Sequence, residues 1–517
     1  MTFFTPRRWL NAGIAISAPL WLLAGCSQSA VAPTAPAPPE GDVAAEAPAP
    51  SLFSIASTAR APRTTPITNI AGMNAAAYAP TVRSTFMDVT PDGRRVAIAW
   101  LVNRTNGVFS RTGEPITWAT SGDPTVPSSF TTPKVIGRRT TGYAATATTY
   151  NKQYNADHNA PFVVGLPNGG FVGLANPMNA NGYAQNLPAT PYGYSQSVIS
   201  PGYTTWAAPG MATLASMPAG SSLSEMSGNA DSAGGVHLFG QGHRGQFQSG
   251  FGYQRRRPGT TTWESKTLAS AYRTGSLNYF AEGGGYASRV KNAKGQYDIH
   301  AAFAWNRAGI KPIYGLSYLV SRDGGTTWQT AAGKAVTLPV THADASAAVF
   351  PANLKSGTVG GSTPGHSTIN VAATHDGAGL IVRPNEVGGS RVRVQHRLYT
   401  FHGGKWIHVP VGPELFWNAN GNGVAYNAKT GRVNVVLLDP GSWAKPARVL
   451  LYHQSLADLR AGKAAWTEEV VASVPQKHYA SSLIAREVKD TRFVVLFESE
   501  YKNPGTVQPV LLEAPMR

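Results

Sequence analysis

The sequence has almost no cysteine: its 517 residues contain one, Cys26. One thiol cannot form a disulfide within the chain, so a fold held together by cross-links is excluded. Charged residues are also few, at 14%, and beyond the N-terminus no long apolar stretch has helical spacing. A predominantly helical fold is therefore not expected.

Glycine and proline, by contrast, are plentiful, with 55 Gly and 38 Pro. Such a composition is typical of many short strands joined by turns, and it predicts an all-β fold. A β domain of about 450 residues buries a large core, so it does not depend on disulfides.

One stretch, beginning at Ser321, reads Ser-x-Asp-x-Gly-x-Thr-Trp and follows an apolar run at residues 313–320. We expect Ser321 and Asp323 to accept hydrogen bonds from turn amides and Gly325 to take a positive φ. Trp328 should bury its ring beneath the turn. The pattern predicts a strand, a tight turn and a second strand.

These residues resemble the Asp box, or BNR repeat, of sialidases and related β-propellers. The Asp box lies on a scaffold turn, so it predicts a hairpin rather than any chemistry. Because a propeller repeats one blade, weaker copies of the pattern should occur elsewhere in the chain.

Two further patterns recur along the chain. A turn followed by tryptophan ends at Trp206, Trp263, Trp406 and Trp466. A turn followed by an alternating or apolar strand occurs at Asp92-Gly93, Asn168-Gly169, Gly234-Gly235, Lys294-Gly295, Asp376-Gly377, Thr430-Gly431 and Asp490-Thr491, the last without glycine. Seven copies predict a seven-bladed β-propeller of four-stranded antiparallel blades over residues 66–517. Its ring should close by pairing the C-terminal strand with one from the N-terminal region.

The N-terminus carries a different signal. Arg7 and Arg8 precede an apolar run at residues 12–24, which is followed by Gly25 and Cys26. This arrangement resembles a bacterial lipoprotein signal with its lipobox, which implies that residues 1–25 are removed and Cys26 is acylated. An ordinary signal peptide or a transmembrane anchor remains an alternative, although the run is short for a span. The arginine pair also resembles a twin-arginine export signal.

Residues 26–65 are rich in alanine and proline and are predicted to form an extended tether. The mature protein would hang from a membrane by the lipid on Cys26, in the cell envelope. Ser27 resembles the default signal for sorting to the outer membrane of a Gram-negative cell. We expect a monomer.

The formal net charge is +17, which is compatible with nucleic acid, an anionic membrane surface or an acidic polysaccharide as partner. Export and tethering argue against nucleic acid. The basic residues are scattered, apart from Arg255, Arg256 and Arg257 just before a hairpin turn. We interpret this triplet as a solvated turn rather than a ligand clamp.

Propellers bind ligands where loops converge at one mouth of the central channel. His158 lies in a polar loop ahead of a strand. Its side chain either faces the channel or is an ordinary surface histidine. His243 and Arg244 end another strand, where an arginine could pair with a carboxylate. His300 and Arg307 fall on opposite faces of one strand, so one of them is expected to be structural.

The order of these segments, with Tyr279-Phe280 between them and Val-Thr-Leu-Pro ending at Pro339, resembles the BNR-4 propeller family over residues 157–339. That family includes lyases acting on ulvan, an acidic polysaccharide. The resemblance implies β-elimination at a uronic acid: the carboxylate is neutralised, a Tyr or His removes the C5 proton, and an acid protonates the departing oxygen.

The resemblance assigns roles by position. His158 would be a base or carboxylate ligand, Arg244 the carboxylate neutraliser, and Tyr279 or His300 an acid–base partner. The chain departs from the family twice, because Asn179 lies in the region of its second histidine and residues 224–227 lack its tyrosine. Substrate-binding residues would be Asn179, His243 and Arg307.

The favoured function is therefore action on an anionic polysaccharide by lyase chemistry. A non-catalytic glycan-binding or scaffold propeller is the main alternative, followed by a sialidase or other glycosidase. Sialidases need a Tyr–Glu pair, and nothing in the sequence ties Tyr399 to Glu386. No short-spaced His or Cys set suggests a metal site, and no cofactor is expected.

Overall fold

The structure of the chain is a computed structural model. All described residues belong to the unit Ala45–Arg517. The expected signal peptide, Cys26, and the tether up to residue 63 lie outside them. The described residues are 64–66, 85–102, 104–105, 108–109, 116–131, 134–138, 162–175, 195–199, 222–244, 250–260, 262–270, 272–274, 277–307, 310–342, 344, 347–349, 369–387, 390–416, 421–441, 446–474, 479–489, 492–500 and 507–517.

The fold is all-β, as predicted. Helix is limited, in these ranges, to the 3-10 turn η1 (Pro127–Ser129) and the short α2 (Leu456–Arg460). None of the described helices is long and apolar enough to cross a membrane.

The first three sheets are small and antiparallel. A separate two-stranded ribbon, β4 (Arg104–Thr105) and β5 (Val108–Phe109), extends from the first sheet. The first sheet contains β2 (Thr85–Val89), β3 (Val96–Val102), β6 (Ile116–Gly122) and β7 (Lys134–Arg138); the second contains β8 (Phe162–Gly165), β9 (Phe171–Ala175) and β10 (Ser195–Ile199); the third contains β11 (Ser222–Ala230), β12 (Val236–Arg244), β13 (Phe251–Arg256) and β14 (Trp263–Ala269).

The fourth and fifth sheets have four strands each. The fourth contains β15 (Tyr272–Thr274), β16 (Leu277–Lys291), β17 (Tyr297–Arg307) and β18 (Ile310–Ser321); the fifth contains β19 (Asn370–Ala373), β20 (Gly379–Val387), β21 (Ser390–His402) and β22 (Lys405–Phe416).

The last sheet has eight strands but divides into two antiparallel groups. A single parallel residue pair, Asn422 with Ile484, joins β23 to β27. One group is β23 (Asn422–Asn427), β24 (Arg432–Asp439), β25 (Ala447–Ser455) and β26 (Thr467–Val474); the other is β27 (Tyr479–Val488), β28 (Arg492–Glu500), β29 (Val507–Pro515) and β1 (Thr64–Pro66).

In the last group the N-terminal strand β1 pairs with the C-terminal strand β29, with Thr64 opposite Leu512. This confirms the predicted closure between the two ends of the domain. The pairing covers the outer edge of β29, and the short β1 becomes the edge strand of the sheet.

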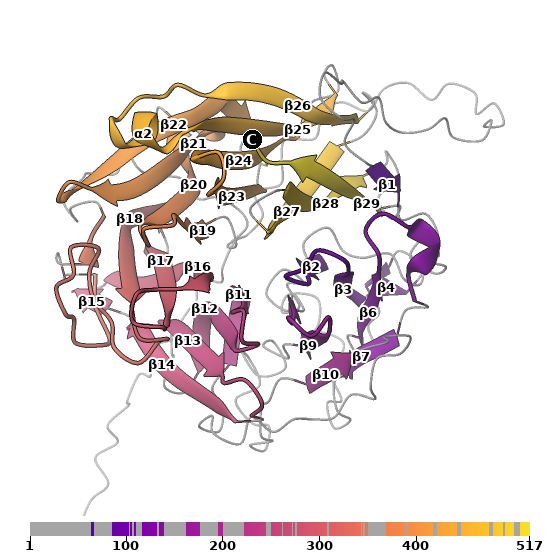
Figure 1. Ribbon diagram of the computed structural model, residues 1–517, viewed down its shortest axis with the longest axis horizontal. Coiled ribbons are helices and arrows are strands. Elements are labelled where there is room, and N and C mark those ends of the chain that lie inside the picture. Colours follow the sequence, from indigo (N-terminus) through magenta and orange to yellow (C-terminus); the bar gives the residue numbers. More distant parts are fainter. Residues whose placement is uncertain are drawn as a thin grey trace, which may run out of the picture. The chain divides into compact units, whose positions relative to one another are not determined.

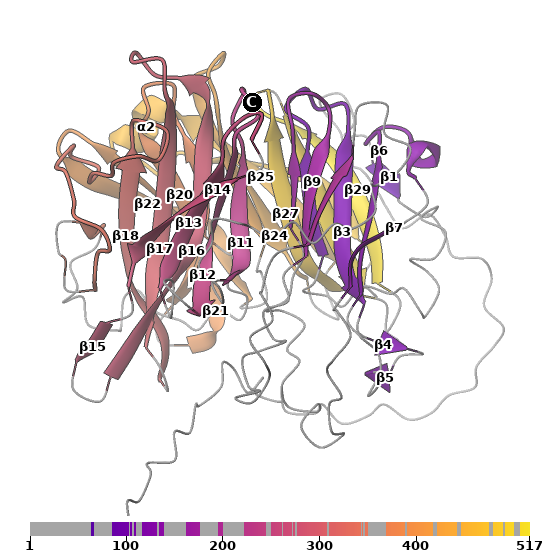
Figure 2. The same cartoon turned by 90° about the horizontal axis from the view of Figure 1, so that it is seen from below.

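The inner strands contact one another in a cycle: β2, β8, β11, β16, β19, β23, β27 and back to β2. Figure 1 shows the sheets following one another in chain order around a central opening, and Figure 2 shows the same strands from the side. Small antiparallel sheets in such an order fit a β-propeller.

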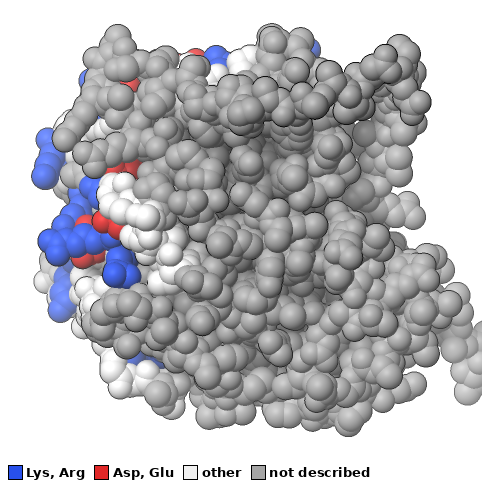
Figure 3. Space-filling view, turned by 90° about the vertical axis from the view of Figure 1, so that its right-hand side faces the viewer, with Lys and Arg blue, Asp and Glu red and all other residues white. Residues whose placement is uncertain are grey.

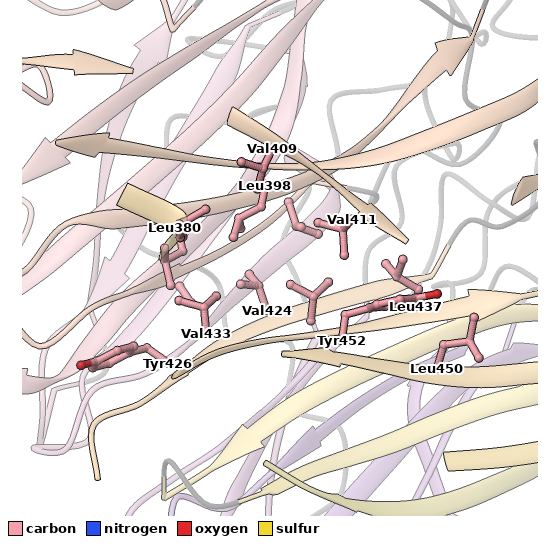
Figure 4. Close-up of a cluster of buried hydrophobic side chains, with 14 of the residues drawn as sticks. Leu380, Leu398, Val409, Val411, Val424, Tyr426, Val433, Leu437, Leu450 and Tyr452 are labelled. Atoms are coloured by element: carbon pink, nitrogen blue, oxygen red, sulfur yellow. The ribbon is translucent and has the colours of Figure 1, made fainter. Parts of the chain in front are cut away.

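Neighbouring sheets pack face to face through apolar side chains. Figure 4 shows one such interface, between the fifth sheet and the β23–β26 group, with Leu398 and Val411 on one side and Val433 and Leu450 on the other. These four side chains are fully buried. Burial of each contributes about 1.5–3 kcal/mol, so the interfaces between sheets form the core.

Each predicted turn-then-strand copy joins an inner strand to the strand that pairs with it next in the sheet. The turns take a positive φ at Gly93, Gly169, Gly234, Gly295, Gly377 and Gly431. In the copy that lacks glycine, Lys489 takes this role with φ of 50°. The glycine position of the repeat is thus confirmed in six copies, because each of these turns needs the left-handed backbone that glycine favours. Asp490 and Thr491 of the seventh copy lie outside the described residues.

The tight turn predicted at Ser321 has the expected hydrogen bonds. Ser321 Oγ accepts the Gly325 amide at 2.8 Å, and Asp323 Oδ1 accepts the Thr327 amide at 2.8 Å. Gly325 has φ of 94°, and Trp328 is buried.

The recurring tryptophans lie at the start of outer strands, and Trp206 falls outside the described residues. Trp328 packs edge-on against Tyr253 of the preceding sheet, with ring centroids 5.3 Å apart. Trp406 repeats this contact with Tyr318 at 5.4 Å. The turn-then-tryptophan pattern therefore marks contacts between neighbouring sheets.

Candidate functional site

The tight turns of neighbouring sheets lie together on one face. Arg492 donates to the Gly93 carbonyl at 3.2 Å, and Arg460 pairs with Asp376 at 2.5 Å. These contacts join turns of adjacent sheets, so we call this side the turn face. The opposite strand ends, marked by Arg244, form what we call the loop face.

Near the turn face, side chains from inner strands meet across the central opening. Tyr286 of β16 donates to Glu487 of β27 at 3.4 Å, and Arg289 donates to the Glu487 carbonyl at 3.2 Å. β16 and β27 are not neighbours in the cycle of inner strands. The inner strands on opposite sides of the ring are therefore bridged near the turn face.

A second pair joins two neighbouring inner strands. Asp88 of β2 and Arg486 of β27 lie 3.4 Å apart. Burial raises the pKa of Asp88, although Arg486 opposes that shift. Asp88 also accepts the Gly165 amide at 2.8 Å, so it ties three inner strands together.

Three predicted site residues lie at the loop face by backbone position. Arg244 is the last residue of β12 and pairs with Ser222. Tyr279 of β16 stands opposite Arg307, the last residue of β17. Because β12 and β16 are in contact, Arg244, Tyr279 and Arg307 belong to the same end of two neighbouring sheets.

The other predicted residues are placed only in part. His243 precedes Arg244 in β12. His158 and Asn179 lie outside the described residues; in sequence they precede β8 and follow β9, respectively.

His300 does not join this group. It is fully buried within β17, and its Nδ1 lies 2.6 Å from the Tyr318 hydroxyl. Burial lowers its pKa to about 3, and seven residues separate it from Arg307, roughly 20 Å along a strand. The acid–base role expected for His300 does not fit this position, so of His300 and Arg307 the former is structural.

A buried hydrogen-bonded chain escaped the sequence interpretation. Asp231 Oδ2 lies 3.0 Å from His237 Nε2, and His237 Nδ1 lies 2.8 Å from the Tyr253 hydroxyl. The three residues are the types found in acid–base sites, but all are buried. The signal in the sequence was a histidine just after a tight turn and a tyrosine on the next strand.

His237–Tyr253 and His300–Tyr318 are copies of one arrangement. In each case the residue two positions after the histidine pairs with the tyrosine, as Phe239 with Tyr253 and Ala302 with Tyr318. Repetition in consecutive sheets at buried positions indicates a structural role for both pairs.

One other interpretation is corrected. Arg255 is not a solvated turn residue, because it is 7% exposed and donates to Glu264 at 2.5 Å and to the Gly324 carbonyl. Arg257 is exposed, as expected. Tyr399 is fully buried and accepts a 2.8 Å hydrogen bond from Asn385, so its position does not fit a sialidase nucleophile.

Charge on the described surface is mixed. In the side view of Figure 3, basic and acidic side chains lie together along one edge. Across the parts of the chain that the structure describes, no cluster of three or more His, Cys, Asp or Glu side chains could hold a metal ion.

Comparison with known proteins identifies no family by sequence. No family model matches the chain, and no curated protein matches it. Among solved structures, a polysaccharide lyase of a new family, PL25 ulvan lyase, aligns with a TM-score of 0.53 at 12% identity, covering 83% of this chain and 92% of that one.

The same lyase bound to -[GlcA(1-4)Rha3S]- aligns with a TM-score of 0.53 at 11% identity, over 83% and 92% of the two chains. The polysaccharide lyase Uly1 aligns with a TM-score of 0.51 at 13% identity, over 85% and 91%. At these identities the likeness establishes a shared all-β fold.

Proposed function

We propose that this chain is a seven-bladed propeller that acts on an anionic, uronic-acid polysaccharide at its loop face. The observation that carries the proposal is the common location of Arg244, Tyr279 and Arg307 at one end of neighbouring sheets. The bridge between Tyr286 and Glu487 near the other face supports this choice of mouth.

The reaction is a β-elimination. Arg244 pairs with the uronate carboxylate, which acidifies the C5 proton. Tyr279 or His158 removes that proton, the C4–O bond breaks, and the departing oxygen takes a proton from an acid. His243, Arg307 and Asn179 bind neighbouring parts of the glycan.

The neighbours in fold support the substrate class. Two of them are described as ulvan lyase, and one holds a fragment containing GlcA, a uronic acid. The net charge of +17 favours a polyanion over a neutral glycan.

A binding protein without catalysis is the second candidate, and one observation favours it. The pairing of β11 with β12 shifts between Ser224 and Ser227, in the region where the lyase family has a tyrosine. Together with Asn179 in the region of a histidine, this irregularity leaves the acid–base machinery incomplete.

The protein is further proposed to be anchored in the cell envelope by a lipid on Cys26. Metabolic labelling with a palmitate analogue tests this directly. Label should appear in the wild-type chain and disappear in Cys26→Ser; label retained in Cys26→Ser would rule the anchor out.

The lyase reaction is tested by the ultraviolet absorbance of unsaturated uronate during incubation with a panel of uronic-acid polysaccharides. We expect the absorbance to rise with the wild-type protein and to stay flat with His158→Ala or Arg244→Ala. Lys294→Ala, an exposed substitution in a tight turn, is the control and should retain activity.

Two results distinguish the candidates. Retention on an acidic polysaccharide gel without any rise in absorbance would favour the binding protein. Neither retention nor absorbance would contradict the proposed substrate class.

A further inference from the structure

A buried arginine without a carboxylate partner lies between the fourth and fifth sheets. Arg383 of β20 is 3% exposed. Its Nη1 donates to the Gly315 carbonyl at 2.9 Å, and no ion pair within the described ranges includes it. Burial lowers its pKa, and the nearby group that opposes this shift is Tyr399 rather than an acid.

The carbonyl that accepts this hydrogen bond from Arg383 lies in an irregular stretch of the fourth sheet. The pairing of β17 with β18 shifts between Phe303 and Trp305, and Gly315 in this irregular stretch has φ of 60°. The irregularity turns one carbonyl toward the neighbouring sheet. One carbonyl satisfies a single N–H of a guanidinium that has five, and it does not neutralise the charge.

A second polar group beside Arg383 is also incompletely bonded. Asn385 lies two residues along β20, on the same face of the strand, and is 3% exposed. Its Nδ2 donates to the Tyr399 hydroxyl at 2.8 Å, whereas its buried Oδ1 has no partner.

The amide orientation of an asparagine is assigned from its hydrogen bonds. Reversed, Asn385 Oδ1 would accept from the Tyr399 hydroxyl and Nδ2 would be the free group. Either orientation leaves the amide unsatisfied. The reversed one adds N–H donors beside those of Arg383, and such a set of donors suits an anion.

We infer that a small monovalent anion of the halide class binds beside Arg383 and Asn385, between the fourth and fifth sheets. A buried charge is strongly destabilising unless it is paired. A water molecule would satisfy hydrogen bonds but not the charge, and a polymer does not fit a side chain that is 3% exposed. This site is separate from the proposed glycan site at the loop face.

The experiment compares thermal unfolding in sodium chloride, sodium bromide and sodium gluconate at equal ionic strength. Gluconate is too large for a buried site. A ligand that binds only the folded state raises Tm in proportion to the logarithm of its concentration once the site fills. We expect Tm to be a few degrees higher in either halide than in gluconate, and the gain to be lost in Arg383→Met.

The matched control is Arg393→Met, which changes an exposed arginine on β21 and should keep the halide gain. Crystals of the wild-type protein soaked in bromide give a readout that does not depend on a variant folding. An anomalous peak is expected beside the Arg383 guanidinium. Equal Tm values in halide and gluconate together with no peak there would overturn the inference.

Discussion

Two histidines show how burial fixes the protonation state of a single residue. His300 and His396 are both fully buried, and burial lowers the pKa of each to about 3. Both are therefore neutral at physiological pH. Neither ring nitrogen of His396 has a hydrogen-bond partner in the described structure. Replacing this side chain by an apolar one therefore breaks no hydrogen bond.

These histidines make stability depend on pH in a definite direction. Their folded-state pKa of about 3 lies below the unfolded value of 6.5. Below pH 6.5 the unfolded chain binds more protons, so stability is complete above pH 6.5 and declines as the pH falls toward 3. Each group contributes a slope of up to about 1.4 kcal/mol per pH unit.

Urea unfolding of His396→Leu over this range measures one of the two contributions. Below pH 6.5 we expect the free energy of unfolding of the variant to fall less steeply than that of the wild type. At pH 7.5 the variant should be no less stable than the wild type. His402→Leu, which changes an exposed histidine on the same strand, is the matched control. Parallel curves for wild type and His396→Leu would show that His396 is not buried and neutral.

The strand-end position of Arg244 could be predicted from the sequence, whereas the burial of His300 could not. Arg244 was predicted at a strand end, where alternation stops, and the backbone places it there. Arg307, predicted only to lie on the opposite face of its strand from His300, is also the last residue of its strand. His300 has the same residue type as a catalytic base, but only the packing of β18 against β17 reveals that Tyr318 covers it. Burial depends on the neighbouring strand, which no local pattern encodes.

At the level of elements, the tight turns carry most of the repeat. Six of the seven predicted copies have a glycine with positive φ at the turn: Gly93, Gly169, Gly234, Gly295, Gly377 and Gly431. The requirement is local, since it concerns one backbone angle. That is why these turns could be predicted from the sequence while the contacts between sheets could not.

Two of these glycines separate backbone strain from crowding. Gly377 has φ of 77°, and an added Cβ would collide with Arg322 and Asp298. Gly431 has φ of 66°, and an added Cβ would meet nothing within 4 Å. We expect Gly431→Ala to destabilise the protein by about 1 kcal/mol, from the left-handed backbone alone.

Gly377→Ala should destabilise the protein clearly more than Gly431→Ala does, because the turn or the Arg322–Asp298 ion pair must also shift. Chemical denaturation of the two variants measures the difference. Equal losses would mean that the neighbours of Gly377 yield freely.

At the level of the whole molecule, two contacts join parts of the chain that lie far apart in the sequence. β1 completes the group of the last three strands, and the Tyr286–Glu487 contact links strands on opposite sides of the opening. The closure by β1 was predicted from the need to cover strand edges. The bridge was not, because Tyr286 and Glu487 are 201 positions apart in the sequence.

This bridge gives the two faces different uses. On the turn face, short turns contact one another, as Arg460 does with Asp376. On the loop face, Arg244, Tyr279 and Arg307 lie at the same end of two neighbouring sheets. If the proposed function is correct, an anionic glycan binds at the loop face and not at the turn face.

Hydrogen–deuterium exchange of the mature protein, with and without a uronic-acid polysaccharide, tests this requirement most directly. It reports the bound face whether or not the protein is a lyase. We predict protection in peptides that contain the end of β12, the start of β16 and the end of β17, and none in the tight turn at residues 292–296. Protection confined to the tight turns would contradict the account.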